Sequence, residues 1–260
     1  WNRSDESDFG GYRIFRKRDD GQGATFKAVG YVDQINDTSF IDQNVLVDDH
    51  SYCYYVIVED DCGNKSLPQD TSCSILLKGV EWPFYFTHSS NPYIYWPTGV
   101  KEYELWSKVD TGLMRYKQTL AAPNGQVQSE DHDLDYNWGG YNYQYRAYNI
   151  TNDTTPSRIS LSNSIYLIQP PLLHVPSAFS PNGDGRNDDW GIVDVFVKTY
   201  QILVFNRWGE KVYDSEDKYA QWNAVYKGDD QNDNVYVWIA YYTGWDERKY
   251  SQKGNVTVIK

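Results

Sequence analysis

The stretch that decides the fold is Pro176-Ser177-Ala178-Phe179-Ser180-Pro181-Asn182-Gly183-Asp184-Gly185-Arg186-Asn187-Asp188. It holds so many turn-forming residues that neither a helix nor a regular strand can run through it. Pro181 fixes its own φ angle and pushes Ser180 into an extended conformation. Asn182-Gly183 and Asp184-Gly185 are pairs that accept positive φ angles at low cost. The sequence therefore predicts a rigid turn loop in the last third of the chain.

A second turn motif follows between two runs of alternating apolar and polar residues. It is Asn206-Arg207-Trp208-Gly209-Glu210, and after it come Trp222 and the terminal run Gly254-Asn255-Val256-Thr257-Val258-Ile259-Lys260. In this order the motifs resemble the type B C-terminal sorting domain of the bacterial type IX secretion system. The same family is described as the gliding-motility-associated C-terminal domain of Bacteroidota surface proteins. The resemblance covers about residues 170–260.

Two positions depart from the family pattern. The family's Trp-Asp-Gly is Trp222-Asn223-Ala224 in this chain, and the Pro-Gly that precedes its last long strand is Asp233-Asn234. Both positions lie at predicted turns. We therefore expect a different loop shape at each position and the same fold.

The resemblance also implies a function. Type B domains are export signals that depend on a cognate outer-membrane receptor of the PorP/SprF type and on shared translocon proteins. We predict Arg207 and Trp208 as direct contacts, because Arg and Trp dominate interface energetics. In the alternative, Trp208 packs under the hairpin while Asn206 and Gly209 only shape its turn. The full set predicted for recognition is Phe179, Pro181, Asn182, Gly183, Asp184, Gly185, Asn187, Asp188, Asn206, Arg207, Trp208, Gly209, Glu210 and Trp222.

Composition limits the function classes. The formal net charge is −12 and there is no basic tract, which argues against a nucleic-acid partner. No apolar run approaches the length of a membrane span, and no signal peptide opens the chain. The 24 Tyr, 10 Trp and 9 Phe residues, against a single Met, are typical of β-rich proteins. Helical periodicity is absent, so the predicted class is all-β.

The first part of the chain predicts a small sandwich. Gly11–Lys17 alternates like a strand with Tyr12 and Ile14 toward a core, and Ser51–Val58 is a strong strand. Ser72–Leu77 is expected to close the unit. The pattern resembles a fibronectin type III domain without its first strand, with Trp1 at the place of a core Trp. The sequence is therefore expected to be a fragment of a longer chain.

An internal repeat extends this prediction. Tyr12 matches Tyr103, Gly21 matches Gly112 and Tyr52 matches Tyr143, each at an offset of 91 residues. The constant offset predicts two copies of one sandwich. With the sorting-like domain they give three consecutive Ig-like or fibronectin III-like antiparallel β-sandwiches at residues 1–78, 79–168 and 169–260. The prolines of Gln169-Pro170-Pro171 predict a stiff joint, and the predicted core or inter-domain aromatics of the second copy are Trp82, Trp96 and Trp106.

Three cysteines lie in the first module and suggest one disulfide with one thiol left over. Cys53 and Cys73 lie on predicted strands that should pair antiparallel. Sandwiches that precede such sorting domains often carry a Tyr-Cys-Tyr…Cys pair, and the second copy lacks both members. The resemblance thus favours Cys53–Cys73, with Cys62–Cys73 as the alternative. No His or second thiol pair has the spacing of a zinc site.

The turn loop also suggests calcium. An EF-hand is excluded because its positions 1 and 12 would be Ser180 and Gly191, neither an anionic ligand. A looser calcium site remains as a minor alternative and would use Asn182, Asp184, Asp188 and Asp189. We favour a turn in which these side chains satisfy their own backbone.

No catalytic motif stands out. Asp48-Asp49-His50-Ser51 holds acid, base and nucleophile types, but sequence neighbours point different ways and make no triad. A Gly-x-Ser-x-Gly elbow and phosphate-binding glycine loops are absent. Ser129–Asp135 is an acidic run that we interpret as a solvated loop. We therefore predict that this region is not an enzyme and carries no cofactor.

Surface aromatics offer a different function. With 43 aromatic residues, some could lie on the surface and stack on sugars or on other proteins, and Trp245 is the candidate for this role. Asp153-Thr154-Thr155 fits an O-glycosylation pattern of Bacteroidota.

Our main hypothesis is that this chain is the C-terminal part of a large secreted surface protein, such as a gliding adhesin, with two spacer modules and a terminal export signal. The alternatives are a carbohydrate- or host-binding module and an accessory region of a secreted enzyme.

Overall fold

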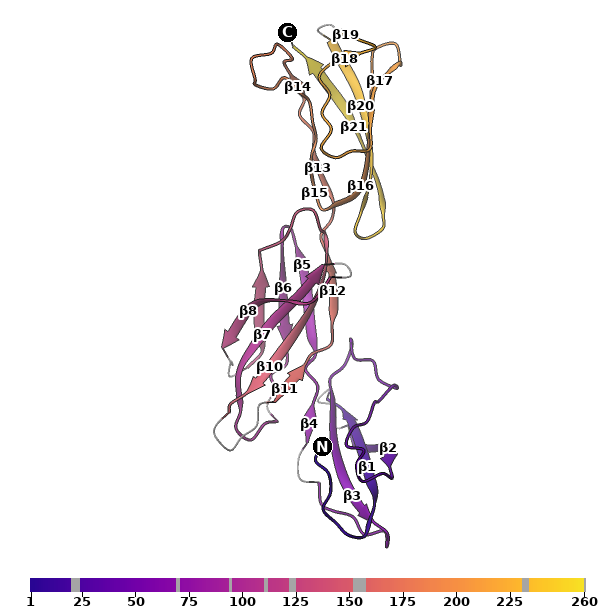
Figure 1. Ribbon diagram of the computed structural model, residues 1–260, viewed down its shortest axis with the longest axis vertical. Helices are drawn as coiled ribbons and strands as arrows, with labels where there is room; N and C mark the ends of the chain where they lie inside the picture. The colour runs from indigo at the N-terminus through magenta and orange to yellow at the C-terminus, as the bar shows by residue number, and fades with distance from the viewer. Residues whose placement is uncertain are drawn as a thin grey trace. The chain divides into compact units, whose positions relative to one another are not determined.

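The computed structural model describes residues 1–19, 24–68, 71–93, 95–109, 112–121, 125–151, 158–230 and 234–259. Every regular element in these ranges is a β-strand, and the long strand pairs β1–β3 (Phe9–Arg18 with Tyr52–Asp60), β16–β20 (Val197–Phe205 with Asn234–Gly244) and β20–β21 (Asn234–Gly244 with Lys249–Val258) are antiparallel (Figure 1). The short pair β14–β21, with β14 at Ala178–Phe179, is parallel. The predicted all-β class is therefore confirmed. A search of the described residues finds no helix with the length and apolarity needed to cross a membrane.

The chain groups into two compact units. The first contains residues 1–80, 86–131 and 142–166, and the second contains residues 81–85, 132–141 and 167–260. The division into three sandwiches at residues 78 and 168 stays a prediction. Asp153-Thr154-Thr155 and Asp233 lie outside the described residues.

One four-stranded sheet lies within residues 1–78, which we call the first module. Its strands are β1 (Phe9–Arg18), β2 (Lys27–Val32), β3 (Tyr52–Asp60) and β4 (Ser72–Cys73), in the order β2-β1-β3-β4. Tyr12 and Ile14 are buried as expected. The predicted strand Ser72–Leu77 is wrong in its extent, because β4 ends at Cys73. The Tyr52 N–H donates to the Ser74 hydroxyl at 3.0 Å. A side-chain oxygen therefore takes the place of the backbone carbonyl that would continue the β3–β4 pairing.

Two sheets follow in the second module. β5 (Leu77–Trp82), β6 (Tyr85–Ser90) and β9 (Val127–Asp131) form one, in the order β5-β6-β9. The other has the order β11-β10-β7-β8, with β12 also paired to β10. Its strands are β7 (Val100–Val109), β8 (Arg115–Ala121), β10 (Gly140–Asn149), β11 (Ile159–Leu161) and β12 (Ile165–Ile168). Tyr12 on β1 and Tyr103 on β7 are equally buried. The repeat offset of 91 residues therefore relates β1 to β7 as equivalent strands.

The second module encloses a polar group of side chains. The Ser129 hydroxyl lies 2.7 Å from the Tyr145 hydroxyl and 3.2 Å from His88 Nδ1. The Tyr143 hydroxyl donates to the Asp131 carboxylate at 2.8 Å. The prediction that Ser129–Asp135 is a solvated loop is therefore wrong for its first part. Val127–Asp131 is a strand whose alternate side chains are buried, because its polar residues find partners in the core.

The last part of the chain forms a five-stranded sheet in the order β14-β21-β20-β16-β17. These strands are β14 (Ala178–Phe179), β16 (Val197–Phe205), β17 (Lys211–Ser215), β20 (Asn234–Gly244) and β21 (Lys249–Val258). Two short pairs complete the fold. They are β13 (Leu172–His174) with β15 (Val193–Val195), and β18 (Val225–Tyr226) with β19 (Asp229–Asp230).

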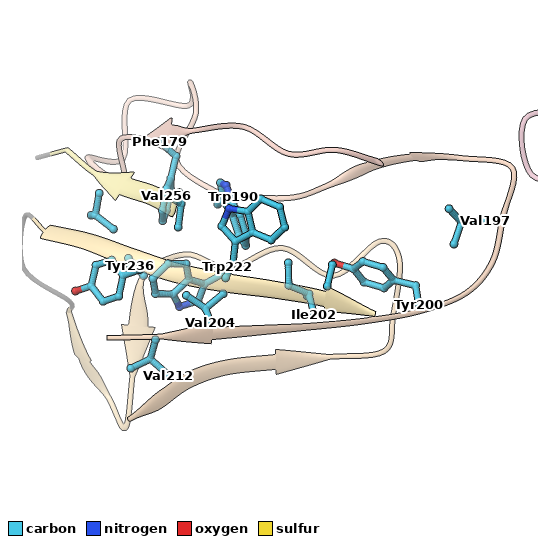
Figure 2. Close-up of a cluster of buried hydrophobic side chains, with 14 residues drawn as sticks. Phe179, Trp190, Val197, Tyr200, Ile202, Val204, Val212, Trp222, Tyr236 and Val256 are labelled. Carbon is cyan, nitrogen blue, oxygen red and sulfur yellow. The ribbon is translucent and has the colours of Figure 1, made fainter. Parts of the chain in front are cut away.

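One core cluster lies against this sheet (Figure 2). Phe179, Trp190, Trp222 and Tyr236 supply its large rings, and the Trp222 ring centroid lies 5.1 Å from that of Tyr236 and 5.5 Å from that of Phe179. Aliphatic side chains of β16 and β21 fill the space between the rings. The core is therefore built around residues of the motifs that the sequence singled out.

The predicted joint is anchored by Gln169, whose side chain is buried. Its amide nitrogen donates to the carbonyls of Trp82 and Tyr85 at 2.9 and 3.2 Å, and its amide oxygen accepts the Phe84 N–H at 3.0 Å. Every polar atom of the side chain thus has a partner, as a buried amide requires. Trp82 itself is 47% exposed, so it is not a core residue, and its place between domains stays a prediction. Its strand position faces outward, and its ring stacks on Tyr85.

Candidate recognition surface

The loop after β14 is fixed by its own side chains. The Ser180 N–H donates to the Asn187 carbonyl at 2.8 Å and closes the loop. Both oxygens of the Asp188 carboxylate accept backbone N–H groups, from Gly183 and from Gly185, at 2.7 Å each. The two glycines have φ angles of 77° and 81°, which side-chain-bearing residues rarely adopt. The loop is thus held in one conformation because the Asp188 carboxylate accepts hydrogen bonds from the backbone of both glycines.

The remaining polar side chains of the loop cap turns in the same way. Asn182 Oδ1 accepts the Asp184 N–H at 3.0 Å, and Asp184 Oδ1 accepts the Arg186 N–H at 2.8 Å. The oxygens proposed as calcium ligands are therefore used by the backbone, whereas Asp189 lies exposed beyond them. Calcium binding at this loop stays an untested alternative, and the self-satisfied turn accounts for each of these contacts.

The Asn206–Glu210 hairpin presents its tryptophan to solvent. Asn206 Oδ1 accepts the N–H groups of Trp208 and Glu210 at 3.0 Å each, and Gly209 has a φ angle of 78°. Trp208 is 79% exposed, with the Arg207 guanidinium carbon 4.8 Å from its ring centroid. The alternative in which Trp208 packs under the hairpin is therefore wrong. The indole therefore projects from the turn into solvent.

Glu210 connects this hairpin to the β18–β19 turn. Its carboxylate accepts hydrogen bonds from the Tyr226 hydroxyl at 3.1 Å and from Lys227 Nζ at 3.2 Å. The hydrogen bond from Lys227, followed by that from Tyr226, holds the pKa of the Glu210 carboxyl below its ordinary value. Lys227 and Gly228 both have positive φ angles, which is the geometry of a tight hairpin turn. Sequence reasoning missed Lys227, although the Gly228 that follows it, with the polar run after that glycine, is a turn signal.

These turns lie at one end of the domain. The loop that follows β14, the β16–β17 turn and the β18–β19 turn all lie at the end where β21 finishes (Figures 1 and 2). Arg207 and Trp208 are the exposed members of the predicted set that combine a cation with a large aromatic face. Arg186 and Lys227 add positive charge on the neighbouring turns. The surface thus offers an aromatic and guanidinium contact site on a stiff support, in surroundings that carry acidic as well as basic side chains.

Two predicted recognition residues lie elsewhere. Phe179 is 3% exposed and Trp222 is 1% exposed, so neither can touch a receptor while the domain is folded. The prediction that they take part in recognition as exposed side chains is wrong, because both pack in the core of the domain. Asn187 and Gly209 have positive φ angles and shape their turns, and Pro181 is half-buried at the start of the loop.

Other sequence candidates are also placed. A disulfide joins Cys53 and Cys73, the pair that the resemblance implied, and Cys62 is an exposed free thiol. Among the described residues, one group of side chains brings metal-ligand atoms together, and it consists of Asp19 and these two cysteines. The two sulfurs are bonded to each other in the disulfide, so they are not free thiolate ligands. Trp245 packs against Trp138 with ring centroids 4.7 Å apart, so it is not a free sugar-stacking platform.

Comparison with known proteins gives one family. Residues 173–258 match the CHU_C type IX secretion signal domain. The matched range contains the loop, the hairpin and the core described above. This secretion signal domain implies export across the outer membrane to a secreted or cell-surface location. No curated protein matches the chain in sequence.

Solved structures resemble the chain only loosely. Four tandem repeats from the extending region of a large adhesion protein share 11% identity, with a TM-score of 0.32 over 96% of this chain and 67% of that one. Three fibronectin domains of chicken CNTN1 share 14% identity, with a TM-score of 0.26 over 98% and 91%. Latent PorU from Porphyromonas gingivalis shares 9% identity, with a TM-score of 0.27 over 96% and 30%.

Proposed function

We propose that the secretion signal domain is read by an outer-membrane receptor through Arg207 and Trp208. The observation that carries this proposal is the 79% exposure of Trp208 at the tip of a hairpin that Asn206 holds rigid. An exposed indole on a preorganised turn loses little conformational entropy on binding, and it offers a large apolar area to a partner. Arg207 lies over its ring and supplies a charge beside it.

The receptor that fits best is a PorP/SprF-type outer-membrane protein acting with the shared type IX translocon. The Arg207 guanidinium beside Trp208 suits an acidic or carbonyl-rich receptor loop, because Arg forms its strongest hydrogen bonds with anionic acceptors. The two preceding modules act as spacers in a surface protein of the adhesin type, with a role in gliding as the expected setting. Their polar surface and disulfide suit an oxidising location outside the cytoplasm.

The test is export of a reporter. The full chain would be fused behind a periplasmic export signal to a fluorescent protein and produced in a Bacteroidota host with a PorP/SprF-type partner. We expect fluorescence at the surface or in the medium only when the translocon is present. We further expect Trp208→Ala to reduce export at least tenfold while the protein stays folded, since one hot-spot aromatic is worth about 2 kcal/mol or more.

The matched control is Tyr219→Ala. Tyr219 is an aromatic residue of the same domain and is 81% exposed. It lies near the start of β16, because the adjacent Lys218 contacts Asp194, which precedes that strand. Trp208 lies beyond the other end of β16. Normal export of Tyr219→Ala with impaired export of Trp208→Ala would support recognition through the hairpin tip. Normal export of folded Trp208→Ala and Arg207→Ala proteins would refute it and leave the loop at residues 180–188 as the surface to examine.

A further inference from the structure

A groove within the first compact unit is lined by residues of both modules. Its rings include Tyr54 on β3, in the first module, and Tyr93, Tyr95 and Trp96, which follow β6 in the second module. The groove has a volume of about 1000 Å³. Binding sites for small molecules measure about 300–1,000 Å³, so this groove can hold a ligand of several rings.

Two tyrosines offer ring faces in this groove, and each is held in place through its hydroxyl group. Tyr54 and Tyr95 are both half-buried. The Tyr54 hydroxyl donates to the Asp42 carboxylate at 3.1 Å, and the Tyr95 hydroxyl lies 3.8 Å from the sulfur of Cys53. The Tyr95 ring also meets the Tyr93 ring edge to face, with centroids 5.8 Å apart. Rings that are fixed in advance lose little conformational entropy when a ligand stacks on them.

Hydrogen bonds connect the two sides of the groove. Tyr54 pairs with Ser72 in the β3–β4 ladder, and the Ser72 hydroxyl lies 2.7 Å from the Tyr93 hydroxyl. The Tyr93 N–H in turn donates to the Tyr103 hydroxyl at 2.7 Å, inside the second module. A continuous chain of contacts therefore runs from Tyr54 to the segment that carries Tyr95. The groove is built into the unit and does not have to form when a ligand arrives.

Polar groups of both charges lie in the same groove. Its lining includes the exposed side chains of Glu6 and Arg158 and the half-buried Thr71. Neither charged group forms an ion pair within the described part of the chain. The Arg158 backbone is fixed by Asn149, whose side-chain oxygen accepts its N–H at 2.7 Å. The groove therefore offers hydrogen-bond donors and acceptors beside aromatic faces, and its opposite charges balance.

Stacking rings beside hydrogen-bonding groups fit a sugar, which has an apolar C–H face and hydroxyl groups around its edge. We propose that this groove binds an oligosaccharide of neutral sugars. Tyr54 and Tyr95 stack on its rings, and Glu6 and Arg158 hydrogen-bond its hydroxyl groups. A hydroxyl both donates and accepts, so it can satisfy either charged side chain.

A proline-rich peptide is the competing occupant, because such peptides also dock on aromatic-lined grooves. Polyproline has no N–H group, so it would cover the Glu6 carboxylate without giving it a donor, and a charged group that loses water without a new partner is costly. The chemistry of the groove thus favours the sugar. The groove lies outside residues 173–258, so binding there does not depend on recognition of the secretion signal domain.

The test is titration calorimetry of the full chain with neutral hexasaccharides, namely cellohexaose, xylohexaose, mannohexaose and chitohexaose. We expect saturable binding of at least one of these probes. Tyr95→Ala should weaken that binding at least about tenfold, whereas Tyr95→Phe, which keeps the ring, should bind within about twofold of the wild type. Tyr54→Ala removes the ring on the other side of the groove and should also weaken binding about tenfold.

Tyr116→Ala is the matched control. This tyrosine lies on β8 in the same compact unit, is 50% exposed and is not part of the groove lining. Its variant should bind as the wild type does. Circular dichroism and thiol titration would confirm that each variant keeps its fold and its disulfide. The proposal is overturned if no probe binds, if folded Tyr54→Ala and Tyr95→Ala proteins bind normally, or if decaproline binds in place of the sugars.

Discussion

Trp190 and Trp222 exchange both of their backbone hydrogen bonds, N–H to carbonyl, at 2.8 Å in each direction. Their rings meet edge to face with centroids 6.2 Å apart. Trp190 directly follows the Pro-Asn-Gly-Asp-Gly loop, and Trp222 opens the Trp-Asn-Ala segment. The two motifs of the secretion signal domain are thus joined through the core, so the position of the loop on the domain depends on the packing beneath it.

We predict that Trp222→Ala destabilises the secretion signal domain by about 3–5 kcal/mol, the usual cost of truncating a large buried aromatic. The indole contacts Phe179, Trp190 and Tyr236, so its truncation leaves a cavity among these rings. Chemical denaturation followed by circular dichroism measures the change. Trp208→Ala is the control, and its unfolding free energy should shift by no more than about 0.5 kcal/mol because the indole is exposed. Similar shifts for the two variants would contradict the arrangement.

Asp188→Ala should loosen the loop. The carboxylate holds the N–H groups of Gly183 and Gly185, and hydrogen bonds to a charged acceptor contribute about 1.5–3 kcal/mol when sheltered and less at a surface. We therefore expect a loss of about 1–2 kcal/mol and faster amide exchange at both glycines. Asp189→Ala is the neighbouring control and should leave exchange at these amides unchanged. Calcium-dependent protection of the wild-type loop that Asp188→Ala removes would instead favour the calcium alternative.

The turns were predictable because their chemistry is local. Asn182, Gly183, Asp184 and Gly185 can satisfy one another within a few residues, so the loop appears in the sequence before any tertiary contact is known. Whether a tryptophan is a contact or a core residue is not local. Trp208 and Trp222 both occur in motifs, and only the sheet that passes beneath Trp222 distinguishes them.

The second module shows a related limit. An alternating polar strand such as Val127–Asp131 looks solvated, because sequence does not reveal that Ser129 and Asp131 will meet tyrosine hydroxyls inside a core. The same limit applies to the end of β4. There the Ser74 side chain accepts a hydrogen bond that a longer strand would have given to the backbone.

Loss of the disulfide should selectively destabilise the first module. Cys53 and Cys73 are separated by 20 residues, so the bond restricts a short loop in the unfolded chain and contributes about 3 kcal/mol in the loop-entropy account. We expect the double variant Cys53→Ser, Cys73→Ser to lose about that amount, measured by denaturation in the absence of reductant. Cys62→Ser is the matched control and should behave like the wild type, since that thiol is exposed and unpaired. Loss of stability in Cys62→Ser would indicate the alternative pairing.

The stability of the second module should depend on pH through His88. The side chain is 2% exposed, and burial lowers its pKa to about 4, although the Asp131 carboxylate opposes that effect. Lys117 pairs with the same carboxylate at 3.2 Å and weakens its pull on the imidazole. In the unfolded chain the histidine titrates near its ordinary value of about 6.5. Between these two pKa values the unfolded state binds a proton that the folded state does not.

It follows that the stability contributed by neutral His88 is complete above about pH 6.5 and is lost as the pH falls toward about 4, by roughly 3 kcal/mol in total. His88→Gln should remove this part of the slope, because glutamine does not titrate. His50→Gln is the control and should keep it. Denaturation midpoints of the three proteins at pH 7, 5.5 and 4.5, chosen to span about that window, measure the effect. An unchanged slope in His88→Gln would show that the pKa of His88 is the same in the folded and unfolded states and that the burial argument fails.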